Sequence, residues 1–519
     1  MLFAGTSSSL LTVSMIAILQ FDGVSLPHFH EFLQQGRLPA TAQLRQRGHW
    51  LSLETPATNW EGATYHSLYS GKSITEHGLY FPFMWAATEQ RVRSHYDYPA
   101  PEPIWDRVGN AGRRFLVIDP YEGRHPKSIK GKALCGWQFK HKITLRRWSV
   151  PRGLDRQLQR QFGRPPLVEE VYGRPSAHYL SKMRNRLLRA PKRAAAVTTA
   201  LLSEECFDLV WITLSSGHVA GHWFLDPSRL LKEQRNGEMK EELDTTLSDA
   251  YAAVDEALSH ILDVLPSTAD IILLSPTSME PSASRAHLLP GMIQAILSEG
   301  RITTRATKAA GNSLWRLRAA VPSDFRAWVA RVLPDSLTME IASRLEMRGV
   351  DWTKTRAFVV PSADCGYVRL NLSGRERDGI VNPGEAEQLL TKIASGLRTF
   401  CDPDGEPAIK KIEFASNSLG LETLFHPFPD LIVHWSERLP QHPAGVGSPQ
   451  FGEIPSSGWG SGRTGEHRDG AWAILVPGSS KLKAPTKPPH ILDIAPTVCA
   501  ALGMDTDGLP GQPLLAPST

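Results

Sequence analysis

Short apolar runs alternate with longer segments of helical periodicity along most of the chain. The apolar runs have the length of buried strands: VSMIAILQF, RRFLVI, FDLVWITL, DIILLS, AFVV, YVRLNL, DLIVHW and AWAILVPG. Helical patterns lie between them, over residues 27–47, 239–265 and 384–400. This alternation predicts an α/β fold, with a mostly parallel sheet sandwiched by helices. Ligands in such folds bind at the carboxyl ends of the strands.

Two segments interrupt this pattern. Residues 122–194 are basic and lack strong strands; their last part, 181–194, holds six Lys/Arg and no acidic residue. Residues 280–352 are helical in pattern, with WRLRAAVPSDFRAWVARVL as the clearest amphipathic piece. We expect both segments to be insertions that form a cap over the cleft. The expected core is then made of residues 10–121, 195–279 and 353–519.

Composition narrows the class of protein further. A hydrophobic content of 41% predicts a folded core, and 57 Lys+Arg against 53 Asp+Glu give a net charge of only +4. A nearly balanced charge argues against a nucleic-acid partner. The five cysteines are far apart and form no C-x-x-C pair, which argues against a disulfide framework and favours a cytoplasmic location. Nor is a membrane span expected, because no stretch reaches the roughly 18 apolar residues that it needs.

Several residues at strand ends are candidate metal ligands. Asp22 directly follows the first apolar run, and His218 and His222 follow the run FDLVWITL at a spacing of four. On a helix, this spacing places both imidazoles on one face, where they can share one ion. His467 precedes the run AWAILVPG and could complete a three-histidine site. The alternatives are ordinary ones: a helix-capping Asp, a surface pair of histidines and a loop histidine.

The chain resembles the alkaline phosphatase superfamily, in its type I phosphodiesterase/nucleotide pyrophosphatase branch. The resemblance spans roughly residues 14–504 and rests on the segments ILQFDGVSLPHFHEFLQQGRLPATAQLRQRG, HSLYSGKSITEHG, FDLVWITLSSGHVAGHW, YVRLNLSGRERDGIV, FPDLIVHW, SGRTGEHRDGAWAILVPG and HILDIAPTVCAALGM. It implies the alkaline-phosphatase-like fold. It also implies hydrolysis of phosphate or related esters by two divalent metals beside a Thr or Ser nucleophile.

Several of the family's functional positions are altered. Asp22 and His467 match family metal ligands, whereas His218 stands where an Asp is usual, with His222 after it. The position of the hydroxyl nucleophile falls on Glu61, with Thr58 and Thr64 as alternatives if the register slips by three. The family's S-D-H-G falls on residues 275–278, SPTS, which lack both metal ligands.

These differences predict a mononuclear enzyme. We expect one divalent metal held by His218, His222 and His467, with Asp22 as a further ligand. Zinc fits best, and iron or manganese also fit. Glu61 and Asp22 would be the acid–base groups of a hydrolase or lyase that acts on an anionic small molecule. The expected substrate-binding residues are Trp60, Thr64, Trp223, Arg146 and Arg147, although both Trp could be core residues and the basic residues a solvated surface.

Two other functions are compatible with the sequence. In the first, a conventional two-metal phosphodiesterase or phosphatase takes its missing ligands from elsewhere, for example Glu280 or Asp226. In the second, the chain is a catalytically inactive, metal-free binding protein. The replacement of a ligand Asp by His218, itself a good ligand, argues against this second possibility.

Overall fold

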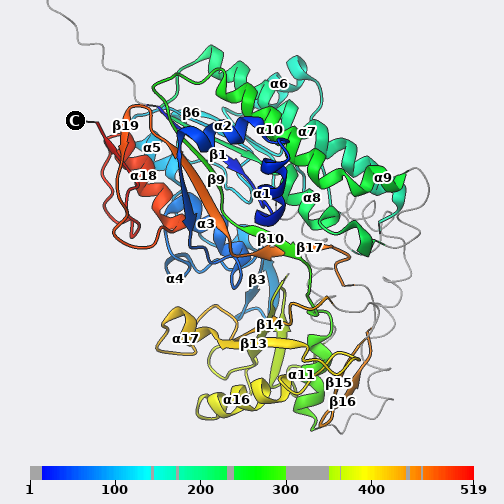
Figure 1. The fold of residues 1–519 in the computed structure, drawn as a ribbon. Coiled ribbons are helices and arrows are strands. Elements are labelled where there is room, and N and C mark those ends of the chain that lie inside the picture. Colours follow the sequence, from blue (N-terminus) through cyan, green and yellow to red (C-terminus); the bar gives the residue numbers. More distant parts are fainter. Residues whose placement is uncertain are drawn as a thin grey trace, which may run out of the picture.

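The chain forms two lobes around two separate sheets (Figure 1). The computed structural model describes residues 15–141, 145–170, 173, 175–230, 239–299, 350–362, 364–439, 445–456 and 460–518. Within this part of the chain, an eight-stranded sheet forms the larger lobe and a four-stranded sheet forms the smaller one.

The large sheet has the strand order β2-β18-β9-β1-β8-β5-β6-β7. Its strands are β1 (Ile16–Phe21), β2 (His49–Leu53), β5 (Phe115–Ile118), β6 (Gly131–Cys135), β7 (Trp148–Val150), β8 (Leu209–Leu214), β9 (Asp270–Ser275) and β18 (Ala471–Val476). The inner strands from β9 to β6 pair in parallel, and β2, β18 and β7 pair antiparallel at the two edges. The prediction of a mostly parallel sheet is confirmed.

Helices cover both faces of this sheet, which is why its inner strands are continuous apolar runs. One face packs against α1 (Leu26–Gln34), α2 (Pro39–Arg47), α7 (Ala177–Glu204), α8 (Ser216–Phe224) and α10 (Thr246–Leu262). The other packs against α3 (Glu61–Ser70), α5 (Ile104–Asn110) and α18 (Ile494–Ala501). Along β1, Ala17 and Leu19 enter the first core, whereas Ile16 and Ile18 enter the second.

The small sheet is antiparallel and has its own core. Its order is β11-β12-β14-β13, with β11 (Ala357–Val360), β12 (Gly366–Leu370), β13 (Ile409–Phe414) and β14 (Leu431–Trp435). Helices α11 (Leu289–Leu297) and α16 (Ala386–Leu397) pack against it. The expectation that residues 353–519 all belong to the main core therefore needs correction: AFVV, YVRLNL and DLIVHW form strands of the smaller lobe.

The two expected insertions also differ from the sequence interpretation. In residues 122–194, β6 and β7 extend the large sheet and α7 covers one of its faces, so this segment belongs to the main core. Of residues 280–352, the described part supplies the end of β10 and all of α11, which packs in the smaller lobe. The amphipathic piece WRLRAAVPSDFRAWVARVL lies outside the described residues.

Shorter elements complete the fold and join the lobes. They are α4 (Ile74–His77), α6 (Leu154–Phe162), α9 (Met239–Asp244), α17 (Ala415–Leu419), the 3₁₀ turns η1 (His95–Asp97), η2 (Pro227–Arg229), η4 (Pro383–Glu385) and η5 (Ile491–Asp493), and the paired strands β3 (Phe83–Ala86) with β4 (Arg91–Ser94), β10 (Ser278–Pro281) with β17 (Gly465–Arg468), β15 (Val446–Ser448) with β16 (Gly452–Ile454), and β19 (Ser480–Leu482) with β20 (Leu515–Pro517). The β10–β17 ribbon runs between the two lobes (Figure 1).

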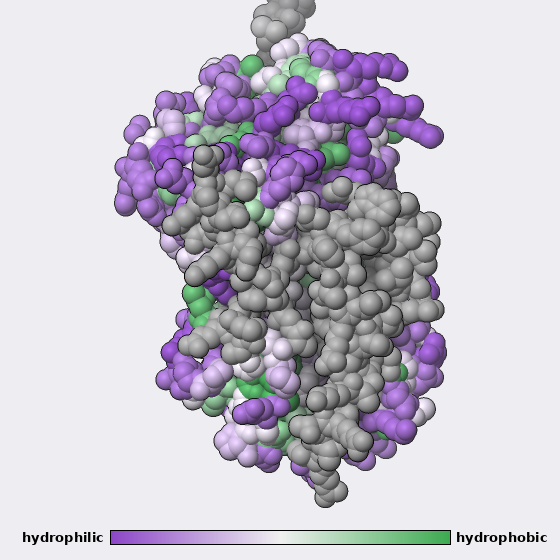
Figure 2. All heavy atoms as spheres, turned by 90° about the vertical axis from the view of Figure 1, so that its right-hand side faces the viewer, coloured by the Kyte–Doolittle hydropathy of each residue, from purple (hydrophilic) through white to green (hydrophobic). Residues whose placement is uncertain are grey.

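Two expectations concern the surface: that the basic segment is exposed to solvent, and that the chain has no membrane span. Hydrophilic residues cover most of the coloured surface of the larger lobe in Figure 2. On α7, Lys182, Arg186, Arg189 and Lys192 are exposed, which indicates a solvated helix face. Among the helices described, none combines the length and apolar character needed to cross a bilayer. All five cysteines are free thiols, and a cytoplasmic location stays a prediction.

The segment RLNLSGRE forms a buried ion cluster in the smaller lobe. Arg369 Nε lies 2.8 Å from Glu376 Oε1, and Arg375 Nη1 lies 2.7 Å from Asp430 Oδ1 on the residue before β14. Burial alone would raise the pKa of Asp430, but the hydrogen bonds and charge of Arg375 lower it. Because every charge in this cluster is paired, removing one partner leaves another buried and uncompensated.

We therefore expect Asp430→Asn to lower the free energy of unfolding by about 3–5 kcal/mol. Chemical denaturation followed by tryptophan fluorescence measures this change. The control is Glu385→Gln, which removes an exposed partner of Arg356 (Nη2–Oε2 2.9 Å) and should change stability by only about 0–1 kcal/mol. Equal effects of the two variants would contradict this account of the cluster.

Candidate metal centre

His218 and His222 lie one turn apart on α8, directly after the carboxyl end of β8. Both side chains are buried, and their Nε2 atoms are 3.0 Å apart. The helix can approach its neighbours closely because of two glycines: a Cβ atom at Gly221 would lie 2.4 Å from Met279 Sδ, and one at Gly217 would lie 2.9 Å from the Phe21 ring. Because the two histidines are four residues apart on a helix, both rings lie on one face, as predicted.

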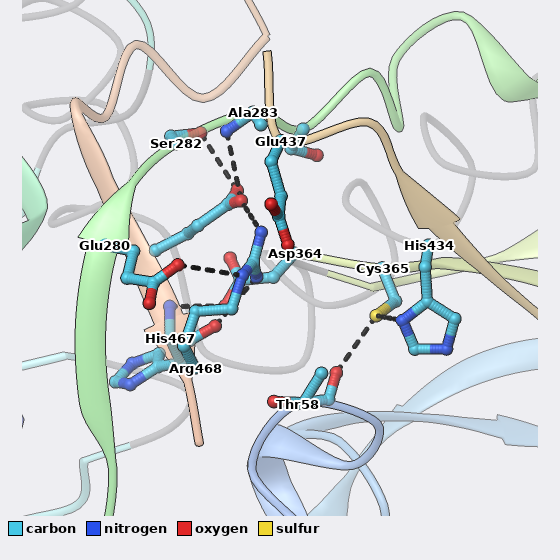
Figure 3. Close-up of polar contacts among 12 residues, drawn as sticks. Thr58, Glu280, Ser282, Ala283, Asp364, Cys365, His434, Glu437, His467 and Arg468 are labelled. Atoms are coloured by element: carbon cyan, nitrogen blue, oxygen red, sulfur yellow. Dashed lines mark hydrogen bonds and ion pairs between the residues drawn. The ribbon is translucent and has the colours of Figure 1, made fainter. Parts of the chain in front are cut away.

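His467 reaches the same place from β17. Its ring centroid lies 4.7 Å from that of His218 and 5.0 Å from that of His222. One ring nitrogen from each of the three histidines lies within 4.8 Å of the others, and all three residues are buried. The backbone N–H of His467 donates to Asp364 Oδ2 at 2.7 Å (Figure 3). Because Asp364 precedes β12 of the smaller lobe, both lobes fix the position of this ring.

The contacts of the outer ring nitrogens determine where the lone pairs point. His218 Nδ1 lies 2.7 Å from Asp22 Oδ2, and His222 Nδ1 lies 3.1 Å from the carbonyl oxygen of Gly465. An ionised carboxylate and a carbonyl only accept hydrogen bonds, so each Nδ1 is the donor. In the neutral rings, both Nε2 atoms then carry lone pairs, and these face each other across 3.0 Å. A cation between them would remove the repulsion.

Protonation of two of the three rings, His222 and His467, is opposed by their surroundings. Burial lowers the pKa of His222 well below its ordinary value, and the charges of Arg463, His218 and His467 lower it further. Burial likewise lowers the pKa of His467 well below its ordinary value, with His218, Arg463 and Arg468 acting in the same direction. Neutral imidazoles are the form that binds metal ions.

Asp22 lies behind His218. Its Oδ2 contacts His218 Nδ1, while its Oδ1 accepts hydrogen bonds from Gln20 Nε2 (2.9 Å) and the Tyr65 hydroxyl (3.1 Å). The sequence predicts Asp22 as a direct metal ligand. In the structure, its carboxylate instead holds the far side of a histidine ring, as outer partners of metal-bound histidines do.

Glu61 faces the histidines from the first turn of α3. Its Oε1 lies 3.3 Å from His467 Nε2, and its Oε2 is buried without a hydrogen-bond partner among the described residues. Burial raises the pKa of Glu61, an effect that Arg463 and His218 partly oppose. Of the two alternatives, the Thr58 hydroxyl accepts the N–H of Asp469 at 2.9 Å, and Thr64 is buried one turn further along α3.

The segment of residues 275–278, after β9, offers no ligand. Ser275 Oγ accepts the N–H of Val24 (3.2 Å), Thr277 Oγ1 donates to the carbonyl of Arg468 (2.8 Å) and Ser278 Oγ accepts the N–H of Leu26 (2.9 Å). These hydroxyls are thus used within the fold.

The two proposed replacement ligands do not reach the three histidines. Glu280 is half exposed and lies 3.9 Å from Arg468 Nε (Figure 3), and Asp226 caps η2 through the N–H of Ser228 at 3.1 Å. Neither belongs to a potential metal-binding group among the described residues. The two-metal alternative therefore lacks the donors that the sequence analysis suggests for it.

Four of the five expected substrate-binding residues are engaged in other contacts. Trp60 is buried against Tyr80, Tyr367 and Phe428, and Trp223 is fully buried, so both are core residues and not walls of a cleft. The Arg146 guanidinium lies 4.5 Å from the centroid of the Tyr96 ring, and Arg147 Nη2 lies 3.9 Å from Asp155 Oδ2. Both arginines are exposed near β7, which corresponds to the solvated basic surface.

The structure adds charged residues that the sequence analysis does not identify. Arg463 pairs with Glu170 (Nη2–Oε2 2.7 Å) and lowers the pKa of two site histidines and of Glu61. Buried Glu466 accepts hydrogen bonds from the Ala283 N–H and the Ser282 hydroxyl, both at 3.0 Å, and pairs with Arg468. The sequence does contain a signal for Glu466 and Arg468, because these two charged residues directly flank the predicted ligand His467 along β17. No sequence pattern links Asp364 to the site.

The comparisons with known proteins agree with this architecture. The family model for type I phosphodiesterase/nucleotide pyrophosphatase matches residues 16–410, so the chain belongs to this family. Membership identifies it as a hydrolase-like enzyme of the alkaline phosphatase superfamily. A search of curated protein sequences finds no match.

Two solved structures share the fold. Phosphonoacetate hydrolase from Sinorhizobium meliloti 1021 in complex with phosphonoacetate has a TM-score of 0.51 at 13% identity, and its complex with phosphonoformate has 0.50 at 14%. Each alignment covers 94% of this chain and 96% of the other. Murine ectonucleotide pyrophosphatase/phosphodiesterase 5 in complex with AMP matches with a TM-score of 0.45 at 11% identity, over 97% of this chain and all of the other.

Proposed function

We propose that this protein is a metal-dependent hydrolase with one divalent ion at its reaction centre, and that it acts on a small anionic molecule. The observation that carries the proposal is the meeting of three buried histidines, His218, His222 and His467, whose ligand atoms lie within 4.8 Å of one another. Three imidazoles suit zinc, and they also accept iron or manganese.

The residues around the three histidines fit such an ion. Two Nε2 lone pairs face each other, and the outer ring nitrogens donate to Asp22 and to the Gly465 carbonyl. When bound, a divalent ion would polarise a substrate oxygen and lower the pKa of a bound water to about 7. In this arrangement Asp22 is a positioning residue that holds the ring of His218. It is fully engaged by Gln20, Tyr65 and His218.

Glu61 is the group placed to move protons. The family resemblance implies that it replaces the hydroxyl nucleophile. Its Oε1 lies 3.3 Å from His467 Nε2, and its Oε2 has no hydrogen-bond partner among the described residues. We assign it the role of general base, which takes a proton from the attacking water and returns it to the leaving group. A covalent intermediate on a Thr or Ser is not needed in this mechanism.

The substrate class follows from what the centre retains and lacks. Residues 275–278, where the resemblance implies the family's second metal ligands, have their hydroxyls bonded within the fold. The charge that clamps a transferring phosphoryl group is therefore reduced. We expect weak turnover of ordinary phosphodiesters. Small phosphonates are the first compounds to screen, because a protein of the same fold is solved with phosphonoacetate.

Removing one histidine should remove the ion. We expect His218→Ala to hold about one equivalent of metal less than the wild type, as measured by elemental analysis of the purified proteins. The control is His260→Ala, which changes an exposed histidine at the end of α10 and should leave the metal content unchanged. An unchanged metal content in His218→Ala would contradict the three-histidine centre, whereas no metal in the wild type would favour a metal-free binding protein.

Glu61→Gln should separate catalysis from metal binding. The amide keeps the shape of the side chain but cannot accept the proton, so turnover of a substrate identified in the screen should fall by about 10²–10⁴-fold while the bound metal is retained. Glu280→Gln is the matched control and should leave both turnover and metal unchanged. Wild-type turnover in Glu61→Gln would exclude the general-base role, and loss of metal in Glu280→Gln would revive the two-metal alternative.

A further inference from the structure

A second group of potential metal ligands lies in the larger lobe, made of His66, His95 and Glu122. His66 is on α3, His95 opens η1, and Glu122 follows β5. One ligand atom from each lies within 4.8 Å of the others, and His66 Nε2 is 3.0 Å from His95 Nδ1. All three side chains are buried. None of them falls on a position for which the family resemblance implies a metal ligand.

Glu122 is the feature that points to a ligand. The residue is only 7% exposed, and its Oε2 is buried without a hydrogen-bond partner among the described residues. Its φ of 54° lies in the left-handed region, which non-glycine residues rarely adopt. Asp119, three residues earlier, also lies in this region, with a φ of 50°. The loop thus accepts backbone strain where it brings a carboxyl group into the interior. Such strain persists where the surrounding structure imposes it, often at ligand sites.

No side chain of the described residues neutralises this carboxyl group. Burial raises the pKa of Glu122 well above its ordinary value, and the nearby charges of Glu61 and Asp22 raise it further. The nearest cation in sequence, Arg124, donates to the carbonyl oxygens of His95 and of Tyr98, the latter at 2.8 Å. A buried carboxylate is costly unless it is paired or binds a metal.

We propose that His66, His95 and Glu122 bind a second divalent transition-metal ion, separate from the ion at the three-histidine centre. Two imidazoles and one carboxylate form a set that holds zinc or iron in proteins and leaves open positions for water or substrate. Tetrahedral zinc ligands lie about 3.4 Å from one another, so closing around an ion needs only small side-chain movements. This inference does not depend on the proposed function.

The second ion would lie close enough to the proposed reaction centre to act on its charged groups. The charges of Asp22 and Glu61 act on Glu122, and Tyr65, which contacts Asp22 and His218, directly precedes His66 on α3. A divalent ion here would supply positive charge next to these carboxylates from residues unrelated to the family's second metal position. Without an ion, the two imidazoles would share an N–H···N hydrogen bond.

Metal stoichiometry of the full-length protein decides between these possibilities. Metal-free protein is incubated with Zn²⁺ alone, desalted and analysed for zinc. We expect about two equivalents in the wild type, one in Glu122→Gln, one in His218→Ala and none in the double variant. Glu122→Gln removes the charge but keeps the shape, and His95→Gln should reproduce its loss of one equivalent. His77→Gln is the control, since His77 lies beside His66 but contacts the Ser67 hydroxyl instead.

The outcomes separate this inference from the proposed function. Wild-type zinc content in folded Glu122→Gln and His95→Gln would overturn the second site. A single wild-type equivalent that is lost in both Glu122→Gln and His218→Ala would also overturn it, because the ion would then be shared. Loss of one equivalent in Glu122→Gln with none lost in His218→Ala would support the second site and refute the three-histidine centre.

Discussion

The facing Nε2 atoms of His218 and His222, 3.0 Å apart in a buried space, are the constraint on which the site depends. Asp22 and the Gly465 carbonyl occupy the outer ring nitrogens, so both lone pairs point inward. Burial keeps the pKa of His222 low and so opposes relief by protonation. This arrangement is unfavourable in an empty protein and favourable around a cation, which is the physical reason for proposing a metal centre at these residues.

The rest of the fold supplies the parts that hold this arrangement. Strand β1 presents Asp22, α8 follows β8 with two histidines on one face, and the β10–β17 ribbon presents His467. The smaller lobe contributes through Asp364, which fixes the backbone of His467. The hydroxyl groups of residues 275–278, where the family resemblance implies two metal ligands, are bonded within the fold. The chain therefore has the family's fold, and the resemblance implies that His218 replaces an Asp ligand on it.

The sequence predicted the parts of this structure that depend on local pattern. Buried strands of the large sheet, the pairing of His218 with His222 and the approach of His467 follow from apolar periodicity and placement at strand ends. The runs AFVV, YVRLNL and DLIVHW were assigned to the wrong lobe, because a buried antiparallel strand and a parallel one have the same apolar pattern. The position of Asp22 behind a ring depends on side-chain geometry, and His66, His95 and Glu122 come from three elements without common spacing.

Anomalous diffraction at the zinc edge from crystals of the purified protein tests the central claim most directly. The account predicts an anomalous peak about 2.0–2.1 Å from one ring nitrogen each of His218, His222 and His467. Asp22 should be hydrogen-bonded to His218 and should not contact the ion. The absence of an anomalous peak at these three histidines would contradict the account. So would an ion held instead between Asp22 and residues 275–278.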